Sequence, residues 1–387
     1  MARIFRFLRI VFVLALVAIG VFALVISHDS ACGEAPPLPG GSTPMQAWAY
    51  RCYGSADVLK LESLGKPVPG DEQVLVRVRA ASLNPLDWHY LHGTPYIMRM
   101  GSGIGAPEDP RLGVDFAGVV EAVGSKVRKF KIGDEVFGGA GGAFADYVLV
   151  RQDRAVALKP ARLSFEQAAA INIAGITALQ ALRNEGKLQA GQKVLINGAS
   201  GGVGTFAVQI AKALGANVTG VCSTRNRDMV RALGADRVVD YTQEDFTRGD
   251  VRYDLVVDLV GNRGIGEIRR VLSANGRLVI VGGPKGNWIG PMTGALKAFV
   301  MSPFVDQEMG MMLAHMDQAD LGTLGQLVDA GKLTAVIDRV YPMQELPEAM
   351  RYLEEGHARG KVVVTFGATT ESDSAPGDQS HAESADK

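Results

Sequence analysis

One stretch of the chain has the residue types that hold a phosphate-containing cofactor. Residues 193–225 read KVLINGASGGVGTFAVQIAKALGANVTGVCSTR. A short apolar run, Val194–Ile196, leads into a glycine cluster, and apolar residues recur at helical spacing after it. Because glycine has no Cβ, such a turn lets the backbone approach a pyrophosphate that lies at the positive end of the following helix. The residues expected to hold the pyrophosphate are Gly201, Gly202, Val203 and Gly204.

The end of the second strand in this unit, predicted over Asn217–Cys222, indicates which dinucleotide binds. An NAD site places Asp or Glu there to hold the ribose hydroxyls. This chain continues with Ser223–Thr224–Arg225 and offers no carboxylate until Asp228. Hydroxyls and a guanidinium suit the 2′-phosphate of NADPH, so Ser223 and Arg225 are its predicted contacts. The alternative is that Arg225 is a solvated loop charge.

Strands and helices continue to alternate after the glycine turn, which predicts a doubly wound parallel sheet. Cofactors lie at the carboxyl ends of such strands, and we therefore expect Val260 and Gly282 to line the site. Residues 284–310 show no clear period. Their large apolar side chains wall a pocket or belong to the core: Trp288, Phe299, Met301 and Phe304. The predicted elements are helices over Asp228–Leu233 and Gly264–Leu272, and strands over Arg237–Asp240, Tyr253–Leu259 and Arg277–Val281.

The N-terminal half of the chain has a different pattern. Gln73–Ala81 alternates as a strand with one solvated face does, and short strands separated by glycine turns follow it up to residue 150. These segments predict an irregular antiparallel β-barrel. A helix is expected after Ser164, its N-cap, with Gln167 at the capping-box position. Residues 336–366 return to a strand, helix and strand.

Length, composition and charge limit the classes of protein to which the chain can belong. A chain of 387 residues with 47% apolar and 21% charged residues is typical of a globular enzyme with more than one domain. The net charge is −1 and the basic residues are not clustered, so no nucleic-acid partner is expected. The three widely spaced cysteines, Cys32, Cys52 and Cys222, predict neither a disulfide framework nor a cysteine-rich zinc lobe.

The two ends of the chain differ from the rest. Arg3, Arg6 and Arg9 precede the charge-free run Ile10–Ile26, about 25 Å long as a helix. This predicts a single-pass membrane anchor, with a cleaved signal peptide as the alternative. The positive-inside rule places the enzyme outside the cytoplasm, whereas the supply of reduced dinucleotide favours the cytosol, and both sides stay open. Residues 35–44 are expected to act only as a tether, and residues 367–387 as a disordered tail.

Five spaced motifs resemble those of the medium-chain dehydrogenase/reductase superfamily, in its zinc-independent quinone-oxidoreductase-like branch. They are SLNPLDWHYLHG, GVDFAGVVEAVG, KIGDEVFG, INGASGGVG and the stretch from GKL to GKVVV at residues 331–364. The resemblance implies a Rossmann domain inserted into a GroES-like barrel domain. The expected parts are an anchor or signal with its linker (1–44), the barrel (45–165), the Rossmann domain (166–316), the completion of the barrel (317–366) and the tail (367–387). A homodimer is kept as an open alternative.

The same resemblance implies that no metal takes part. Zinc-dependent relatives carry Cys where this chain has Asn84 and His–Glu where it has Val114–Asp115. Zinc needs at least three N, S or O ligands in fixed geometry, and the sequence offers no such set.

The resemblance also implies roles for individual residues. Asn84 and Thr177 lie near the nicotinamide and its ribose, Tyr241 flanks the adenosine phosphate, and Lys361 reaches the cofactor from the barrel domain. Related quinone reductases have a tyrosine at the position of His89. The donor that polarises the substrate therefore stays open, and with Asn84 the catalytic candidates are His89, Tyr90 and Tyr96.

Three functions are compatible with these residues. The favoured one is hydride transfer from NADPH to a quinone or an α,β-unsaturated carbonyl. In that reaction the protein supplies orientation and hydrogen-bond donors for the oxygen that gains charge. The alternatives are a metal-free reductase of aldehydes or ketones and a non-catalytic, membrane-tethered dinucleotide-binding protein.

Overall fold

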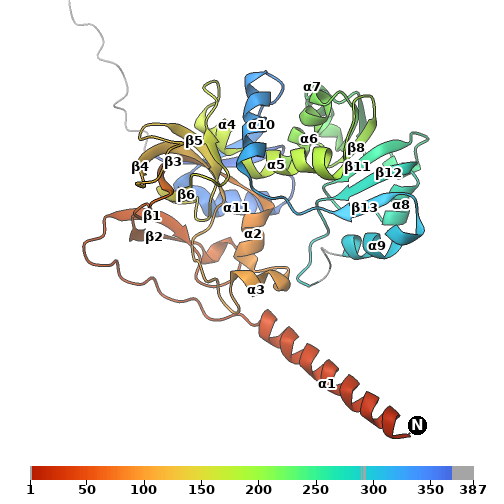
Figure 1. The fold of residues 1–387 in the computed structure, drawn as a ribbon, viewed down its shortest axis with the longest axis horizontal. Helices are drawn as coiled ribbons and strands as arrows, with labels where there is room; N and C mark the ends of the chain where they lie inside the picture. The colour runs from red at the N-terminus through yellow and green to blue at the C-terminus, as the bar shows by residue number, and fades with distance from the viewer. Residues whose placement is uncertain (1, 289, 291–292, 368–387) are drawn as a thin grey trace, which may run out of the picture.

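The computed structural model describes residues 2–288, 290 and 293–367. Two lobes stand side by side, each built around its own sheet, and the long helix α1 (Ala2–Ser27) projects away from both (Figure 1). The predicted combination of a Rossmann sheet, a GroES-like barrel domain and an apolar N-terminal helix is confirmed. Apart from Gly367, the predicted disordered tail lies outside the described residues.

The Rossmann lobe contains a parallel sheet with the strand order β10-β9-β8-β11-β12-β13. Helices cover both faces of this sheet, which is why its strands are apolar runs rather than alternating ones. Asn197, at the end of β8, is in register with Val221 of β9 and Asp258 of β11. The carboxyl ends of the central strands therefore meet at one edge. The strands are β8 (Lys193–Asn197), β9 (Asn217–Cys222), β10 (Arg237–Asp240), β11 (Tyr253–Asp258), β12 (Leu272–Ile280) and β13 (Glu308–Met311).

The helices of this lobe pack on two separate cores. Ile196, Phe206 and Val257, none of them accessible to solvent, belong to the core on one face of the sheet, and Val256 and Ile268 to the core on the other. The predicted helix over 264–272 is shorter than expected, because Leu272 already begins a strand, and the sixth strand β13 was not predicted. The helices are α5 (Asn172–Gln180), α6 (Gly202–Ala213), α7 (Arg227–Ala232), α8 (Ile265–Arg269), α9 (Thr293–Met301) and α10 (Gln318–Asp329).

The barrel lobe contains a second sheet with the order β14-β15-β3-β4-β5-β7, and β6 also pairs with β3. Its pairs are antiparallel as expected, except for the parallel pair of β14 and β15. β15 comes from the C-terminal segment and pairs with β3, so the end of the chain completes this sheet. The strands are β3 (Gln73–Leu83), β4 (Asp115–Val123), β5 (Glu135–Gly139), β6 (Tyr147–Arg151), β7 (Val156–Leu158), β14 (Ile337–Pro342) and β15 (Lys361–Thr365).

Smaller elements surround the barrel sheet. The helix after Ser164 has the predicted capping box, in which the Ser164 hydroxyl accepts from the Gln167 N–H and the Gln167 side chain accepts in return. The others are the strand pair β1 (Pro44–Ala49) and β2 (Lys60–Gly65) and the helices α2 (Pro85–His92), α3 (Arg99–Ser102), α4 (Phe165–Ala169) and α11 (Leu346–Glu354).

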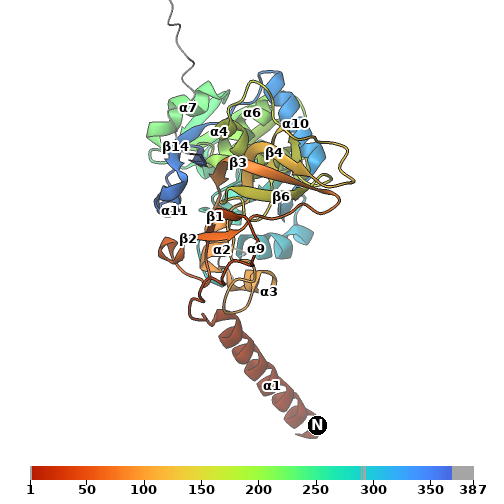
Figure 2. The same ribbon diagram turned by 90° about the vertical axis from the view of Figure 1, so that its left-hand side faces the viewer.

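The junction between α1 and the barrel lobe is more than a tether. The Arg99 side chain, 1% exposed, donates to the carbonyl oxygens of Ile26 (3.2 Å) and His28 (3.0 Å) and pairs with Asp29 (2.8 Å). A disulfide joins Cys32 to Cys52 of the barrel lobe. These contacts fix the end of α1 to the barrel lobe before residues 35–44, the segment expected to act as a tether, begin. Figure 2 shows α1 leaving the body directly below α3.

Residues 284–310, which follow β12, were expected either to wall a pocket or to belong to the core, and most of their large apolar side chains do neither. Trp288, Phe299 and Phe304 are 47%, 77% and 84% exposed, so they neither wall a closed pocket nor form core. Of these four residues, Met301 packs against the core around Ile268. This segment therefore presents apolar side chains to the outside.

Candidate active site

The two lobes meet where α6 begins and β15 begins. Gly201 and Gly360 form an isolated parallel bridge, and the Gly360 N–H donates to the Ser200 carbonyl oxygen at 2.9 Å. A Cβ on Gly202 would lie 3.2 Å from the Lys361 side chain. The predicted pyrophosphate turn and Lys361, which the resemblance assigned to the cofactor, are thus brought together from opposite lobes.

A buried polar cluster lies at this meeting point. The Lys361 ammonium donates to the Leu83 carbonyl oxygen at 3.0 Å and to the Asn84 side-chain oxygen, and lies 3.6 Å from the Asp115 carboxylate. The Asn84 amide in turn donates to Asp115 at 2.9 Å. Asn84, Asp115 and Lys361 are all at most 3% exposed. Burial lowers the pKa of Lys361, and the neighbouring carboxylates act in the opposite direction.

A second layer of side chains fixes this cluster. Asn172 at the start of α5 donates to Asp115 at 2.8 Å, and the Ser82 hydroxyl donates to it at 2.9 Å. Asp87 accepts from the Asn84 backbone N–H at 2.7 Å and so sets the start of α2. Burial, reinforced by the charge of Asp115, raises the pKa of Asp87 to about 7. Sequence reasoning missed Asn172, because its contact with Asp115 joins residues 57 positions apart.

The glycine turn between β8 and α6 lets a ligand approach the backbone closely. Gly198 has a φ of +90°, a conformation that favours glycine. A Cβ on Gly204 would lie 2.1 Å from the Gly198 carbonyl oxygen, so the helix can start only with glycine there. The first turn of α6 has neither an acidic residue nor a side-chain cap, so its N–H groups stay available to an anion. Val203 follows in the same turn and packs against the core beneath.

The other end of the crevice lies at the ends of β9 and β10. Arg225 is exposed and donates to the His357 carbonyl oxygen at 2.7 Å, while Ser223 precedes the short turn after β9 and makes no side-chain cap hydrogen bond. Tyr241 is 49% exposed and follows β10 directly. Near these residues, Asn226 Oδ1, Arg227 Nε and Asp240 Oδ2 are buried without a protein partner among the described residues. Such orphaned polar atoms fit a polar ligand, and here the residues present fit a dinucleotide.

Asp240 was missed by sequence reasoning, which searched for a carboxylate only along the chain after β9. It is in register with Cys222, the last residue of β9, and is 4% exposed. One of its oxygens accepts from the Thr242 hydroxyl at 2.7 Å. The usable signal was the alignment of strand ends in a parallel sheet, which places the last residues of neighbouring strands together.

The remaining predicted contacts lie at the same edge of the sheet. Val260 and Gly282 follow β11 and β12, and the Val260 N–H donates to the Asp258 carboxylate at 3.1 Å. Thr177 is 7% exposed within α5.

The three donor candidates occupy different surroundings. His89 Nδ1 lies 2.6 Å from the Thr94 carbonyl oxygen and therefore donates to it, while burial lowers the pKa of the ring. Tyr90 packs against the barrel core. The Tyr96 ring contacts Trp288 edge-on, with 4.8 Å between ring centroids, and its N–H donates to the Asn287 carbonyl oxygen. Tyr96 is thus the candidate at the seam between the lobes.

Comparison with known proteins identifies the family. The family described as "Alcohol dehydrogenase GroES-like domain" matches residues 70–160, and the one described as "Zinc-binding dehydrogenase" matches residues 233–364. A 2-methylene-furan-3-one reductase of Solanum lycopersicum is 36% identical over 89% of this chain and 85% of that protein. The chain belongs to the medium-chain dehydrogenase/reductase superfamily, in its quinone-oxidoreductase-like group.

Two further relatives of this group match almost the whole of their own length. The chloroplast envelope quinone oxidoreductase homolog of Arabidopsis thaliana is 34% identical over 83% of this chain and 98% of that protein. The solved quinone oxidoreductase of Coxiella burnetii is 34% identical, with a TM-score of 0.74, and covers 84% of this chain and 100% of that structure. Like these relatives, the chain is an oxidoreductase of the nicotinamide-dependent type.

The cluster around Lys361 contains two of the positions that were compared with zinc-dependent relatives in the sequence analysis. Asn84 and Asp115 stand at the ligand positions named above, and here they face the Lys361 ammonium. Within the described residues, no group of three or more His, Cys, Asp or Glu side chains is arranged to hold a metal ion. Zinc independence stays a prediction.

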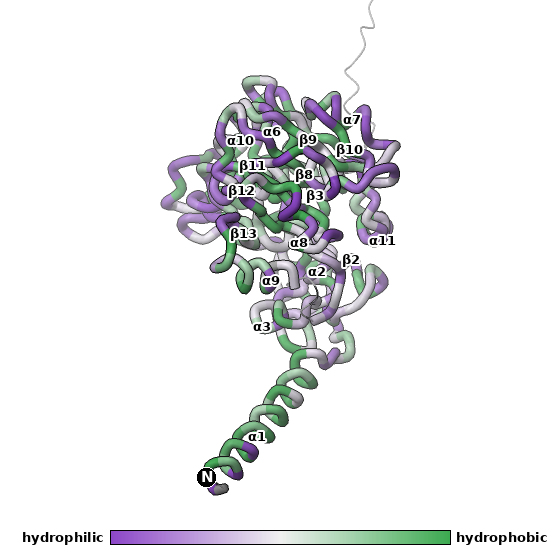
Figure 3. The backbone as a smooth tube through the Cα atoms, turned by 90° about the vertical axis from the view of Figure 1, so that its right-hand side faces the viewer, coloured by the Kyte–Doolittle hydropathy of each residue, from purple (hydrophilic) through white to green (hydrophobic). Residues whose placement is uncertain are grey.

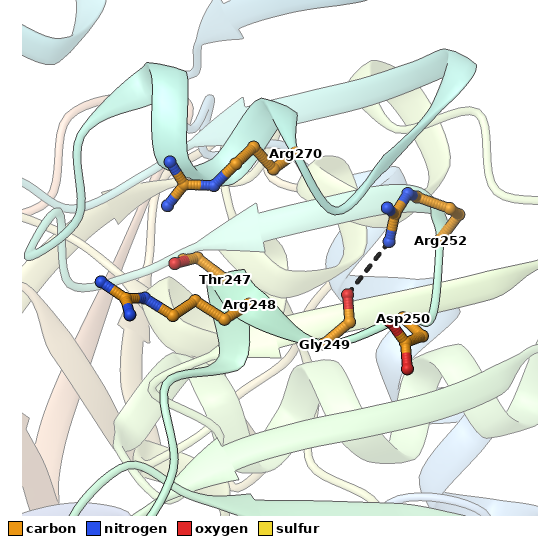
Figure 4. A pocket seen from close by; sticks show the side chains of 6 residues that line it. All are labelled: Thr247, Arg248, Gly249, Asp250, Arg252 and Arg270. Carbon is orange, nitrogen blue, oxygen red and sulfur yellow. Dashed lines mark hydrogen bonds between the residues drawn. The ribbon is translucent and has the colours of Figure 1, made fainter.

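A surface cavity of about 380 Å³ lies elsewhere on the Rossmann lobe (Figure 4). Residues 247–250, Arg252 and Arg270 line it, and Arg252 donates to the Gly249 carbonyl oxygen at 3.0 Å. This lining precedes β11, which begins at Tyr253, so the cavity lies at the amino ends of the strands. Cofactors of parallel sheets bind at the carboxyl ends, and the cavity is therefore separate from the crevice.

Proposed function

We propose that this oxidoreductase transfers hydride from NADPH, without zinc, to a quinone or to a C=C bond conjugated to a carbonyl. The observation that carries the proposal is the convergence of the glycine turn, Asn84 and Lys361 from three distant parts of the chain. Relatives named as a 2-methylene-furan-3-one reductase and a quinone oxidoreductase homolog support the substrate class. When bound, NADPH supplies the hydride.

The protein's own residues orient the cofactor and prepare the substrate. Gly201, Gly202, Val203 and Gly204 hold the pyrophosphate at the start of α6. Asn84 and Lys361 fix the ribose next to the nicotinamide, and Thr177, Val260 and Gly282 line the nicotinamide pocket. Because Asn84 and Lys361 are held by Asp115, they are positioned before any ligand arrives, which is what catalysis by orientation requires.

Tyr96 is the proposed donor to the substrate oxygen. His89 Nδ1 donates its proton to a carbonyl, so Nε2 of the neutral ring carries none, and the lowered pKa keeps the ring neutral near pH 7. Tyr90 is half-buried and packs against the barrel core, whereas the Tyr96 ring contacts Trp288 at the seam between the lobes. Tyr96→Phe should lower turnover of enones by roughly a hundredfold, with Tyr90→Phe as the matched control.

NADPH is the proposed cofactor because cationic and hydroxyl side chains gather beyond β9. Ser223 and Arg225 would bind the 2′-phosphate, and Tyr241 would flank the adenosine. Asp240 lies next to this loop; one of its oxygens accepts from Thr242, and the other has no protein partner among the described residues and would accept from the cofactor.

The deciding experiment is steady-state oxidation of NADPH with matched panels of quinones, enones, aldehydes and ketones, after dialysis against a chelator. Turnover of quinones or enones that survives dialysis is the expected result. Turnover confined to aldehydes and ketones would favour the alcohol dehydrogenase-type alternative. Tight NADPH binding without turnover of any substrate would favour the non-catalytic alternative.

We further propose that α1 anchors the protein in a membrane. An 18-residue window within its segment Arg3–Ser27 has a mean hydropathy of 3.1, and the helix projects from the body alone. The arginines before the span and the Cys32–Cys52 disulfide both favour a location of the enzyme domain outside the cytoplasm, because disulfides persist in oxidising compartments. Resistance to carbonate extraction and a mature N-terminus at Met1 or Ala2 would support the anchor. Finding Cys32 and Cys52 as free thiols in intact cells would contradict the location of the enzyme domain outside the cytoplasm.

A further inference from the structure

Apolar side chains are exposed on the side of the body from which α1 leaves. In α9, Leu296, Phe299 and Val300 are 60%, 77% and 57% exposed, and their spacing places them on one face of the helix. Ala298 on the other face is buried in the core around Ile268. α9 thus packs one face on the core and turns an apolar face away from the protein.

A second segment extends this surface. The stretch from Tyr96 to Ile104, which contains α3, also exposes large apolar side chains, and Phe304 follows α9 with 84% of its area exposed. Figures 1, 2 and 3 show α3 and α9 at the end of the body where the apolar helix α1 leaves it. We call this surface the α3–α9 face; its members are Ile97, Met100, Ile104, Leu296, Phe299, Val300 and Phe304.

The charges on this face suit a lipid surface. Residues 293–305 contain a single charged residue, Lys297, which is exposed, and residues 96–104 contain only Arg99, which is buried. Neither segment contains a carboxylate. An apolar face with an exposed lysine complements lipid chains and the anionic headgroups above them.

The position of α1 joins this face to the proposed membrane span. Arg99 binds the carbonyl oxygens of Ile26 and His28 and packs on the Tyr53 and Tyr96 rings, with its guanidinium carbon 4.2 and 4.6 Å from their centroids. The last turn of α1 is therefore fixed to the segment that carries Ile97 and Met100. A bilayer crossed by α1 would meet the body at this face.

We propose that the α3–α9 face docks on the surface of the lipid bilayer that α1 crosses. The inference rests on the proposed anchor and deepens the proposed function, because Tyr96 and Trp288 close the seam between the lobes beside this face. Trp288, 47% exposed, has the character of side chains that lie at the membrane–water interface. The substrate is then a quinone or enone dissolved in the bilayer, which enters the crevice from the lipid side.

Docking is tested on the full-length chain in lipid nanodiscs. An environment-sensitive fluorophore is attached at Val300→Cys, or at Leu158→Cys as the control. The two side chains are 57% and 58% exposed, and Leu158 lies in β7, which packs against α10 at the end away from α1. The remaining thiol, Cys222, is buried and burial raises its pKa to about 11, so it does not compete for the label.

Brominated lipids should quench the label at position 300 and leave the label at position 158 unchanged. Equal quenching at the two positions would overturn the proposal. Energy transfer between labels at position 300 in two copies of the chain, without quenching by lipid, would assign the face to a second copy and would also overturn it.

The substrate route is tested with the double variant Phe299→Ser/Phe304→Ser. It should reduce a short, water-soluble enone as the wild type does, but lose roughly tenfold in turnover of a long-chain quinone embedded in the disc, because the docked apolar area falls. An equal loss with both substrates, or no loss with either, would overturn the route. If the wild type reduces neither substrate, the proposed function fails, and the quenching experiment still decides whether the face docks.

Discussion

The two ends of the cofactor crevice differ in how their side chains are held. At one end, Asn84, Asp115 and Lys361 are buried and bonded to one another across three segments of the chain. At the other, Arg225 lies on an exposed loop and contacts a backbone carbonyl oxygen. Substitutions at the first end should lower the stability of the fold, whereas substitutions at the second should not. The proposed catalytic end is thus preorganised, and the proposed cofactor-selecting end can vary without loss of the fold.

The largest effect is expected at the buried end, for Lys361→Met. The change removes the ammonium next to Asp115 and leaves a buried carboxylate without a countercharge. We expect the free energy of unfolding to fall by about 3–5 kcal/mol, measured by urea denaturation. A second change, Asp115→Asn, should restore much of this loss, because it removes the unpaired charge.

Lys159→Met is the matched control for this prediction. The Lys159 side chain is also nearly buried, at 5% exposure, but its partner Glu135 is 50% exposed and can be solvated by water. Breaking this pair should cost about 1 kcal/mol or less. Equal losses for the two lysine variants would show that Lys361 stabilises the fold no more than a surface pair does.

A smaller effect, confined to the cofactor, is expected at the exposed end. Arg225→Ala should weaken NADPH binding by about tenfold to a hundredfold, because a hydrogen bond to a charged group contributes roughly 1.5–3 kcal/mol. NADH binding and the free energy of unfolding should barely change. The measurement is titration of the apoenzyme with each dinucleotide. A wild type that prefers NADH would contradict the assignment of Arg225 to the 2′-phosphate.

The difference between the two ends also explains what the sequence could predict. β9 and β10 have the predicted bounds, and β8 and α6 surround the glycine turn as expected, because an apolar run, a glycine cluster and a helical period are local signals. The contacts that hold Asp115, by contrast, come from residues far apart in the chain. Asn172 was missed for this reason, and Asp240 was missed because its place next to Cys222 depends on the register of β9 and β10. The resemblance to a family, not the pattern, pointed to Lys361.

The other errors lie where tertiary contacts override local pattern. β13 has the sequence EMGM, which carries no strand signal, yet it extends the sheet by pairing with β12. The apolar residues Phe299 and Phe304 were expected in a pocket or the core, because the sequence cannot show which side of a helix the body covers. No prediction was made for Arg99, because its burial depends on contacts to the end of α1 that the local sequence does not show.

The last and smallest effect concerns Asp87, which accepts a hydrogen bond from the Asn84 backbone N–H at the buried end. Its pKa is raised by burial to about 7, from the ordinary value of 3.8. Between these pH values the carboxyl is protonated in the folded protein and ionised in the unfolded chain, so its contribution to stability is lost as the pH rises towards 7. Asp87→Asn does not titrate. The wild type should therefore lose stability between pH 5 and pH 6, and the variant should not. The unfolding free energy of the variant minus that of the wild type should rise by at most about 1.4 kcal/mol over this interval.

The control for this prediction is Asp71→Asn at an exposed site. A hydrogen bond from Lys126 lowers the pKa of Asp71, so this carboxylate is ionised in both folded and unfolded protein at pH 5 and pH 6, and the difference from wild type should stay constant. Urea denaturation of the three proteins at both pH values provides the comparison. A constant difference for Asp87→Asn as well would mean that Asp87 is ionised in the folded protein. Its negative charge would then support Lys361 together with Asp115, and the buried end would hold two carboxylates against one ammonium.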